Sequence, residues 1–166
     1  FARLLREGLP VAADLPRGLF SGEAALLDRL KQLRRLGVKT VLAQNIASIY
    51  TARSLGLKID TGIGVPAFNT DSLIQLEEMG VSSVLLSPEL TAAQMAALGA
   101  EICRGVFAYG RLPLMLTRNC PMRNATDCTH CAQQGKLTDR MGIEFPLQCR
   151  WGCTEVLNSR SIWTAD

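Results

Sequence analysis

The amino-acid sequence predicts an α/β fold of parallel (β/α) units, followed by a cysteine-rich metal-binding segment. Short apolar runs alternate with helical patterns over residues 9–116, which is typical of a parallel sheet. The run Gly37-Val-Lys-Thr-Val-Leu42 returns as Gly80-Val-Ser-Ser-Val-Leu85, so a pair of βα units repeats. Five of the six cysteines lie between Cys120 and Cys153. We therefore expect a (β/α) portion over residues 1–118 and a cysteine-rich segment over residues 119–166, packed on the same domain.

The composition is that of a globular protein rather than a membrane protein. The chain has 166 residues, of which 48% are hydrophobic and 20% charged, enough for one domain with a sizeable core. No apolar run approaches the roughly 20 residues that span a bilayer, so we expect no membrane partner. The net charge of +3 permits an anionic partner such as RNA without requiring one. Because a large apolar part precedes the cysteines, we expect them to be reduced and the protein to be cytoplasmic.

The first predicted strand covers residues 9–13. Ser21 is placed to cap the helix that follows, and Gly37 ends this helix after about Leu36. Its buried face is predicted from leucines that recur every three or four residues: Leu26, Leu27, Leu30, Leu33 and Leu36.

The following units repeat this alternation. Residues 38–43 predict a strand, residues 46–55 a short helix and residues 57–60 another strand. Thr70 or Asp71 is placed to cap the next helix.

The last part of this portion continues in the same way. Residues 81–86 predict another strand, and residues 102–109 and 112–116 are apolar again. Thr91 and Gln94 form the pattern of a capping box, which starts another helix. Cys103 lies inside an apolar run, so we expect it in the core.

Right-handed crossovers between these strands lead either to a doubly wound sheet or to a piece of a (β/α) barrel. An eight-stranded barrel typically needs about 250 residues, and this sequence predicts only about five strands before Cys120. The chain also begins at Phe1 without a methionine. We therefore expect it to be part of a longer protein.

Polar residues that follow the predicted strands indicate a ligand site, because parallel strands present their carboxyl ends at one rim. These residues are Asp14, Arg17, Gln44, Asn45, Asn69, Glu89, Arg111 and Arg118. Glu89, Arg111 and Arg118 are the substrate-binding candidates. The two arginines are predicted to line a pocket near the metal and to attract an anionic ligand, since guanidinium groups bind phosphate and carboxylate in a bidentate manner. The alternative is a salt bridge from an arginine to Asp139 or Glu144.

The cysteines give the most specific pattern. A Cys-x-x-Cys pair, Cys128 and Cys131, puts two thiolates on one turn, and more distant cysteines complete four-coordination. One set of four ends in Cys149 and Cys153 and resembles a zinc ribbon, C-x2-C-x17-C-x3-C. The other begins at Cys120, ends at Cys149 and suits zinc or a [4Fe–4S] cluster. Spacing does not choose between them.

His130 is the only histidine. A Ser–His or Cys–His nucleophile pair would have to use it within the cysteine segment. This argues against a self-contained protease.

Several motifs resemble one known family in their order and spacing. They are Ser87-Pro-Glu-Leu90, Gly110-Arg-Leu-Pro-Leu-Met115, Arg118-Asn-Cys120-Pro, Leu137-Thr-Asp-Arg140, Phe145-Pro-Leu-Gln-Cys149 and Leu157-Asn-Ser159. Together they are similar to the collagenase-like peptidase family U32, over residues 37–166. The resemblance implies a partial TIM-barrel-like fold, of which this chain is the later part and residues 1–118 the barrel portion.

The resemblance also implies a cofactor and a function. The family was named for proteolysis, but several members support hydroxylation of RNA or ubiquinone and hold a cysteine-ligated iron–sulfur cluster. The implied metal ligands are Cys120, Cys128, Cys131 and Cys149, with Cys153 as an extra thiol. We therefore expect a [4Fe–4S] domain that supports RNA hydroxylation, with zinc in aerobically prepared protein and with RNA or a small anionic ligand as partner. The alternatives are a collagenase-like protease and a structural zinc module.

Overall fold

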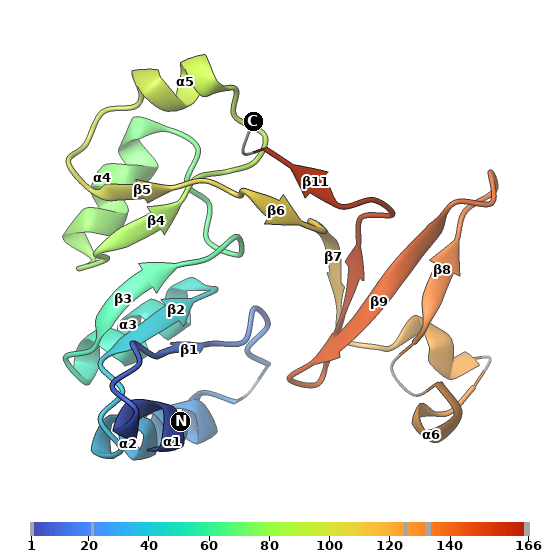
Figure 1. Ribbon diagram of the computed structural model, residues 1–166, viewed down its shortest axis with the longest axis horizontal. Coiled ribbons are helices and arrows are strands. Elements are labelled where there is room, and N and C mark those ends of the chain that lie inside the picture. Colours follow the sequence, from blue (N-terminus) through green and yellow to red (C-terminus); the bar gives the residue numbers. More distant parts are fainter. Residues whose placement is uncertain (1, 21, 125, 132–133, 165–166) are drawn as a thin grey trace. The chain divides into compact units, whose positions relative to one another are not determined.

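The computed structural model describes residues 2–20, 22–124, 126–131 and 134–164 (Figure 1). The chain divides into two compact units, Phe1–Phe107 and Ala108–Asp166. The sequence placed a boundary between residues 118 and 119, where the cysteine segment starts. The observed division lies earlier, because the strands within residues 109–117 pair with strands that follow the cysteines.

The first unit contains a parallel five-stranded sheet, as the sequence predicts. Its strands are β1 (Ala12–Asp14), β2 (Thr40–Ala43), β3 (Lys58–Thr61), β4 (Ser83–Leu85) and β5 (Cys103–Gly105). Each strand pairs with the next one along the chain, in the order β1-β2-β3-β4-β5. A doubly wound sheet reverses this direction at its switch point, whereas a (β/α) barrel does not. Within the described residues the strand order does not reverse, and β1 and β5 are open edges, so the sheet does not close into a barrel.

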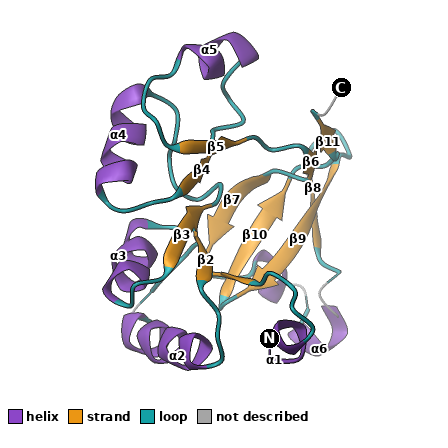
Figure 2. Ribbon diagram, turned by 60° about the vertical axis from the view of Figure 1, so that its left-hand side comes forward, coloured by secondary structure: helices purple, strands orange, loops and turns teal. Residues whose placement is uncertain are grey.

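In the part of the chain that the structure describes, one helix precedes these strands and four connect them. They are α1 (Ala2–Arg6), α2 (Glu23–Arg35), α3 (Ile46–Ser54), α4 (Thr70–Glu78) and α5 (Ala92–Ala97). Figure 2 shows α2, α3 and α4 on the same side of the sheet, as crossovers in one direction require. Among the described residues, no helix has the length and apolar character needed to cross a membrane.

The helix caps agree only partly with the sequence predictions. The capping box of Thr91 and Gln94 at the start of α5 is confirmed. The cap of α4 is Asn69, whose side chain accepts a hydrogen bond from the backbone N–H of Ser72, so the predictions of Thr70 and Asp71 are wrong by one or two residues. Ser21, the predicted cap of α2, lies outside the described residues. The helix itself starts after Gly22.

The core of the first unit lies between the sheet and the helices. Alternate strand residues such as Val41, Ile59 and Val84 point into it and are buried. Leu26 and Leu30 of α2 are also buried, as predicted. Leu36 is 51% exposed, because α2 ends at Arg35 and Leu36 is its C-cap.

Cys103 is exposed, so the prediction that it belongs to the core is wrong. It lies on the edge strand β5 and pairs with Ser83 of β4. Ser83 belongs to the less buried face of the sheet, whereas its neighbour Val84 faces the helices. The sequence showed an apolar run but not which of its residues face away from the helices.

The second unit is antiparallel. Four strands form a sheet in the order β7-β10-β9-β8, and β6 pairs with β11. Their bounds are β6 (Tyr109–Gly110), β7 (Pro113–Thr117), β8 (Lys136–Thr138), β9 (Glu144–Arg150), β10 (Cys153–Leu157) and β11 (Ile162–Trp163). A short 3-10 helix (Pro121–Asn124) and α6 (Cys128–Cys131) lie between β7 and β8.

The prediction of parallel strands up to residue 116 is therefore wrong for its last part. A parallel pair needs a crossover of about a dozen residues or more, usually through a helix. The segment between β5 and β7 contains only the two-residue strand β6. β7 instead pairs with β10, which follows the cysteine segment.

Candidate metal centre

Gln44 contacts the end of β1 and the loop that follows β3. Its Nε2 donates to Asp14 Oδ1 at 2.9 Å, and its Oε1 accepts from the Gly64 backbone at 3.3 Å. A Cβ at Gly62 would lie 2.4 Å from Gln44 Oε1, and one at Gly64 would lie 2.2 Å from the Gln44 carbonyl oxygen. Both positions therefore require glycine, because a larger residue would clash with Gln44. The Gln44 side chain in turn links the ends of β1, β2 and β3.

Asn45 and Asn69 also stabilise local structure. Asn45 donates from Nδ2 to the carbonyl oxygens of Pro16 and Arg17 and accepts from the backbone of Ser48 at the start of α3. Asn69 caps α4. Glu89 is exposed in the turn after β4, and its backbone N–H donates to Ser87 Oγ at 3.3 Å.

The two arginine candidates belong to the second unit. Arg111 Nη1 donates to the carbonyl oxygen of Asn158 at 2.8 Å and also to that of Ser159, so it links the β6–β7 turn to the segment after β10. Arg118 is exposed. The suggested acidic partners are engaged elsewhere: Glu144 pairs with Lys136, and Asp139 accepts from the backbone of its own turn.

The four cysteines of the set that starts at Cys120 line one pocket of about 130 Å³, called here the cysteine pocket. Its described lining is Cys120, Met122, Arg123, Thr126, Asp127, Cys128, Cys131 and Cys149. Neither Arg111 nor Arg118 is among these residues. Arg123 does line the pocket, although the sequence did not predict a role for it.

Cys149 lines the pocket and Cys153 does not, for a reason that lies in the β9–β10 hairpin. Trp151 and Gly152 form its two-residue turn with positive φ angles of 53° and 74°, the combination of a type I′ turn. The register then pairs Cys149 with Thr154, and these two side chains share a face. Successive residues of a strand face opposite sides, so Cys153 points away and is 5% exposed.

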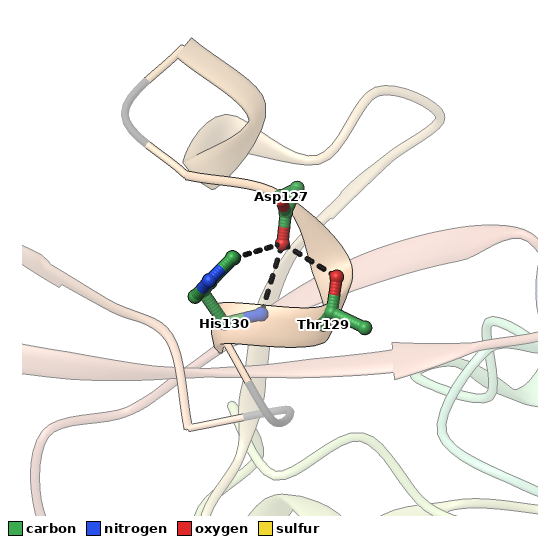
Figure 3. A network of polar contacts seen from close by, with 3 residues as sticks. All are labelled: Asp127, Thr129 and His130. Atoms are coloured by element: carbon green, nitrogen blue, oxygen red, sulfur yellow. Dashed lines mark hydrogen bonds and ion pairs between the residues drawn. The ribbon is translucent and has the colours of Figure 1, made fainter.

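Asp127 holds the turn that carries Cys128 and Cys131 (Figure 3). Its Oδ1 accepts three hydrogen bonds, from the backbone of His130 at 2.9 Å, from Thr129 Oγ1 at 2.8 Å and from His130 Nδ1 at 2.7 Å. The bond from the His130 backbone, followed by those from the two side chains, lowers the pKa of the Asp127 carboxyl group. The carboxylate therefore caps α6 and places both cysteines on one turn.

Cys120 lies among hydrogen-bond donors. The backbone N–H of Met122 is the main reason that its pKa is lowered, and the Thr154 hydroxyl, the Cys149 thiol and the Arg123 backbone act in the same direction. These donors favour the thiolate, the form that binds metals. Cys149 Sγ lies 3.6 Å from the Thr154 hydroxyl oxygen.

Gly135 lies beside Met122 and Cys131, two residues that line the pocket. A Cβ at this position would lie 2.8 Å from Met122 Cγ and 3.3 Å from Cys131 Sγ. The glycine therefore leaves space beside the sulfur.

The donor set of the pocket suits a metal centre with four thiolates. Within the described residues, however, no three His, Cys, Asp or Glu side chains converge on a point that could hold an ion. The cysteines thus surround one pocket without their sulfurs being drawn together.

His130 is positioned by Asp127 and its side chain is 80% exposed. A hydrolase would need a nucleophile within hydrogen-bonding reach of the imidazole. Among the described residues, no hydroxyl or thiol group hydrogen-bonds to the ring, whose partner is the carboxylate. The arrangement is that of a helix cap rather than of a catalytic triad.

Comparison with known proteins agrees with the motifs. No curated protein and no solved structure matches the chain. The family model described as Peptidase family U32 matches residues 22–147, a span that includes the parallel strands β2–β5 and three of the four cysteines of the pocket. Because the match covers most of the chain, the protein belongs to peptidase family U32.

Proposed function

We propose that the cysteine pocket binds a [4Fe–4S] cluster through Cys120, Cys128, Cys131 and Cys149, and that this domain supports hydroxylation of RNA or a related substrate. The observation that carries the proposal is that all four cysteines line one pocket although they come from three separate segments. The lowered pKa of Cys120 supports it, because a bound cysteine is a thiolate. When bound, such a cluster supplies transfer of single electrons.

The residues around the pocket have distinct roles in this proposal. Asp127 holds the Cys128–Cys131 turn, and the backbone around Met122 donates hydrogen bonds to Cys120. Hydrogen bonds to the sulfurs and the degree of solvent exposure are the main means by which a protein tunes a cluster. Hydroxylation as the overall reaction rests on the family resemblance alone.

Zinc is the second candidate for the same pocket, because four thiolates also form a structural zinc site. The capped Cys-x-x-Cys turn favours it as much as it favours a cluster. Metal analysis distinguishes the two. We expect protein purified without oxygen to contain iron and acid-labile sulfide and to absorb broadly in the visible range. Zinc without sulfide would indicate the structural module, and absence of both metals would contradict the proposal.

An RNA partner is supported by the net positive charge and by the arginines of the second unit. We expect Arg118→Ala to weaken binding of a short single-stranded RNA and to reduce the slope of log affinity against log salt by about one, since one phosphate contact is lost. Arg34→Ala, at an exposed position of α2 in the first unit, is the matched control. An unchanged affinity in Arg118→Ala would remove this residue from the proposed site.

A further inference from the structure

The side chain of Thr154 is almost completely buried beside the cysteine pocket. It is 2% exposed, and the hydroxyl residues Ser48 and Thr61 of the first unit are also buried, at 0% and 2%. The hydroxyl oxygens of Ser48 and Thr61 have no hydrogen-bond partner among the described residues. The hydroxyl oxygen of Thr154, in contrast, lies 3.6 Å from Cys149 Sγ.

The strand register explains why Thr154 reaches Cys149 and lies near the connection that leads to Cys120. In the β9–β10 hairpin it lies opposite Cys149, and on its other side it lies opposite Thr117 of β7. From Thr117 the chain runs through Asn119 to Cys120. Thr117 Oγ1 donates to the carbonyl oxygens of Asn119 at 2.7 Å and Thr154 at 3.3 Å, which ties this connection to β10.

We propose that Thr154 is a positioning residue of the cysteine pocket, whose hydroxyl donates a hydrogen bond to the metal-bound sulfur of Cys149. This inference rests on the proposed function and goes beyond its ligand set. A thiolate bound to a metal has no proton to donate, so the hydroxyl must be the donor.

Two consequences follow from this role. Partners of metal ligands typically contribute about 10–100-fold to metal affinity. In a cluster, a donor to sulfur also stabilises the reduced state more than the oxidised state, because the reduced state carries one more negative charge. Loss of the hydroxyl should therefore weaken metal binding and make the reduction potential more negative.

The test separates the hydroxyl from the shape of the side chain. Thr154→Val keeps the shape and removes the hydroxyl, whereas Thr154→Ser keeps the hydroxyl and removes the methyl group. With Zn²⁺ as the probe and a chelator as competitor, we expect Thr154→Val of the full chain to lose about 10–100-fold in affinity and Thr154→Ser to stay near wild type. Thr61→Val, the same change at an equally buried site, is the control and should bind Zn²⁺ like wild type.

The opposite order, with Thr154→Ser impaired and Thr154→Val like wild type, would mean that Thr154 only fills space. That result, or equal affinity in both variants, would overturn the inference. If Thr154→Val does not fold, Thr154→Ala and Thr154→Ser form a second pair that differs only in the hydroxyl group. In the cluster-loaded protein, the potential of Thr154→Val should be more negative than that of Thr154→Ser.

Failure of the proposed function gives a different result. A wild-type chain that binds neither Zn²⁺ nor a cluster would contradict the metal centre itself. A wild-type chain that binds Zn²⁺ tightly, together with a Thr154→Val variant of the same affinity, would contradict only the role of Thr154.

Discussion

The parallel unit buries a continuous apolar core, whereas the antiparallel unit buries only Leu147, Cys153 and Val156 among its described apolar residues. Many large apolar side chains of the antiparallel unit are instead exposed, for example Met141 at 77% and Trp163 at 59%. Units of fewer than about 70–80 residues rarely obtain enough stability from a single core and commonly rely on a metal or on disulfides. We therefore expect the first unit to be stabilised by packing and the second to depend on the metal centre proposed for its cysteines.

The largest effect that this comparison predicts is that of metal removal. Binding of structural zinc amounts to about 10–16 kcal/mol in small peptides, and a comparable contribution would dominate the stability of the antiparallel unit. We expect chelation to expose the amides of β7, β9 and β10 to hydrogen exchange while those of β2 and β3 stay protected. Equal loss of protection in both units would contradict the separation of their stabilities.

A core substitution should show the reverse pattern. Leu73 of α4 is completely buried in the parallel unit. Leu73→Ala is expected to lower the free energy of unfolding of that unit by about 2–5 kcal/mol, because it removes apolar contacts and leaves a cavity. Chemical denaturation followed by metal analysis tests this, with Ile74→Ala as the control because the Ile74 side chain is 42% exposed. If Leu73→Ala lost metal while the stability of the parallel unit stayed unchanged, the two units would not be stabilised in the separate ways proposed.

The smallest effect is expected from a matched pair of glycines. Gly56 of the parallel unit and Gly152 of the antiparallel unit have φ angles of 64° and 74°, and a Cβ would meet nothing within 4 Å at either position. Alanine at each site should therefore cost about 1–2 kcal/mol through backbone strain alone. Thermal unfolding of metal-loaded and metal-free protein measures both. Metal removal should lower the unfolding temperature of Gly152→Ala more than that of Gly56→Ala. An equal decrease in both variants would contradict the proposed difference between the two units.

Local patterns in the sequence predicted most of the parallel unit. The strands and the capping box at Thr91 follow from short-range periodicity and spacing. The set of four cysteines that line one pocket was implied by the family resemblance, because spacing did not choose between the two possible sets. The pairing of β7 with β10 could not be predicted in this way, because the two strands are separated by the whole cysteine segment. The exposure of Cys103 likewise depends on its position on an edge strand, which an apolar run does not reveal.

The sequence did contain one signal that was missed. Trp151-Gly152 between two β-like runs is a candidate for a two-residue hairpin turn. Recognising it would have placed Cys149 and Thr154 on one face and Cys153 on the other. Arg123 has no such signal, because its place in the pocket depends on how the short 3-10 helix folds back.

The most direct test of the metal centre compares Cys149→Ser with Cys153→Ser. The two cysteines are close in sequence, but only Cys149 lines the pocket. Each substitution makes the same chemical change, the replacement of a sulfur atom by an oxygen atom. Metal bound per chain should be measured after anaerobic purification, with Cys103→Ser as the control. The account predicts that Cys149→Ser loses most of the metal, whereas Cys153→Ser and Cys103→Ser retain it. Retention by Cys149→Ser together with loss by Cys153→Ser would contradict it and favour the ligand set of a zinc ribbon.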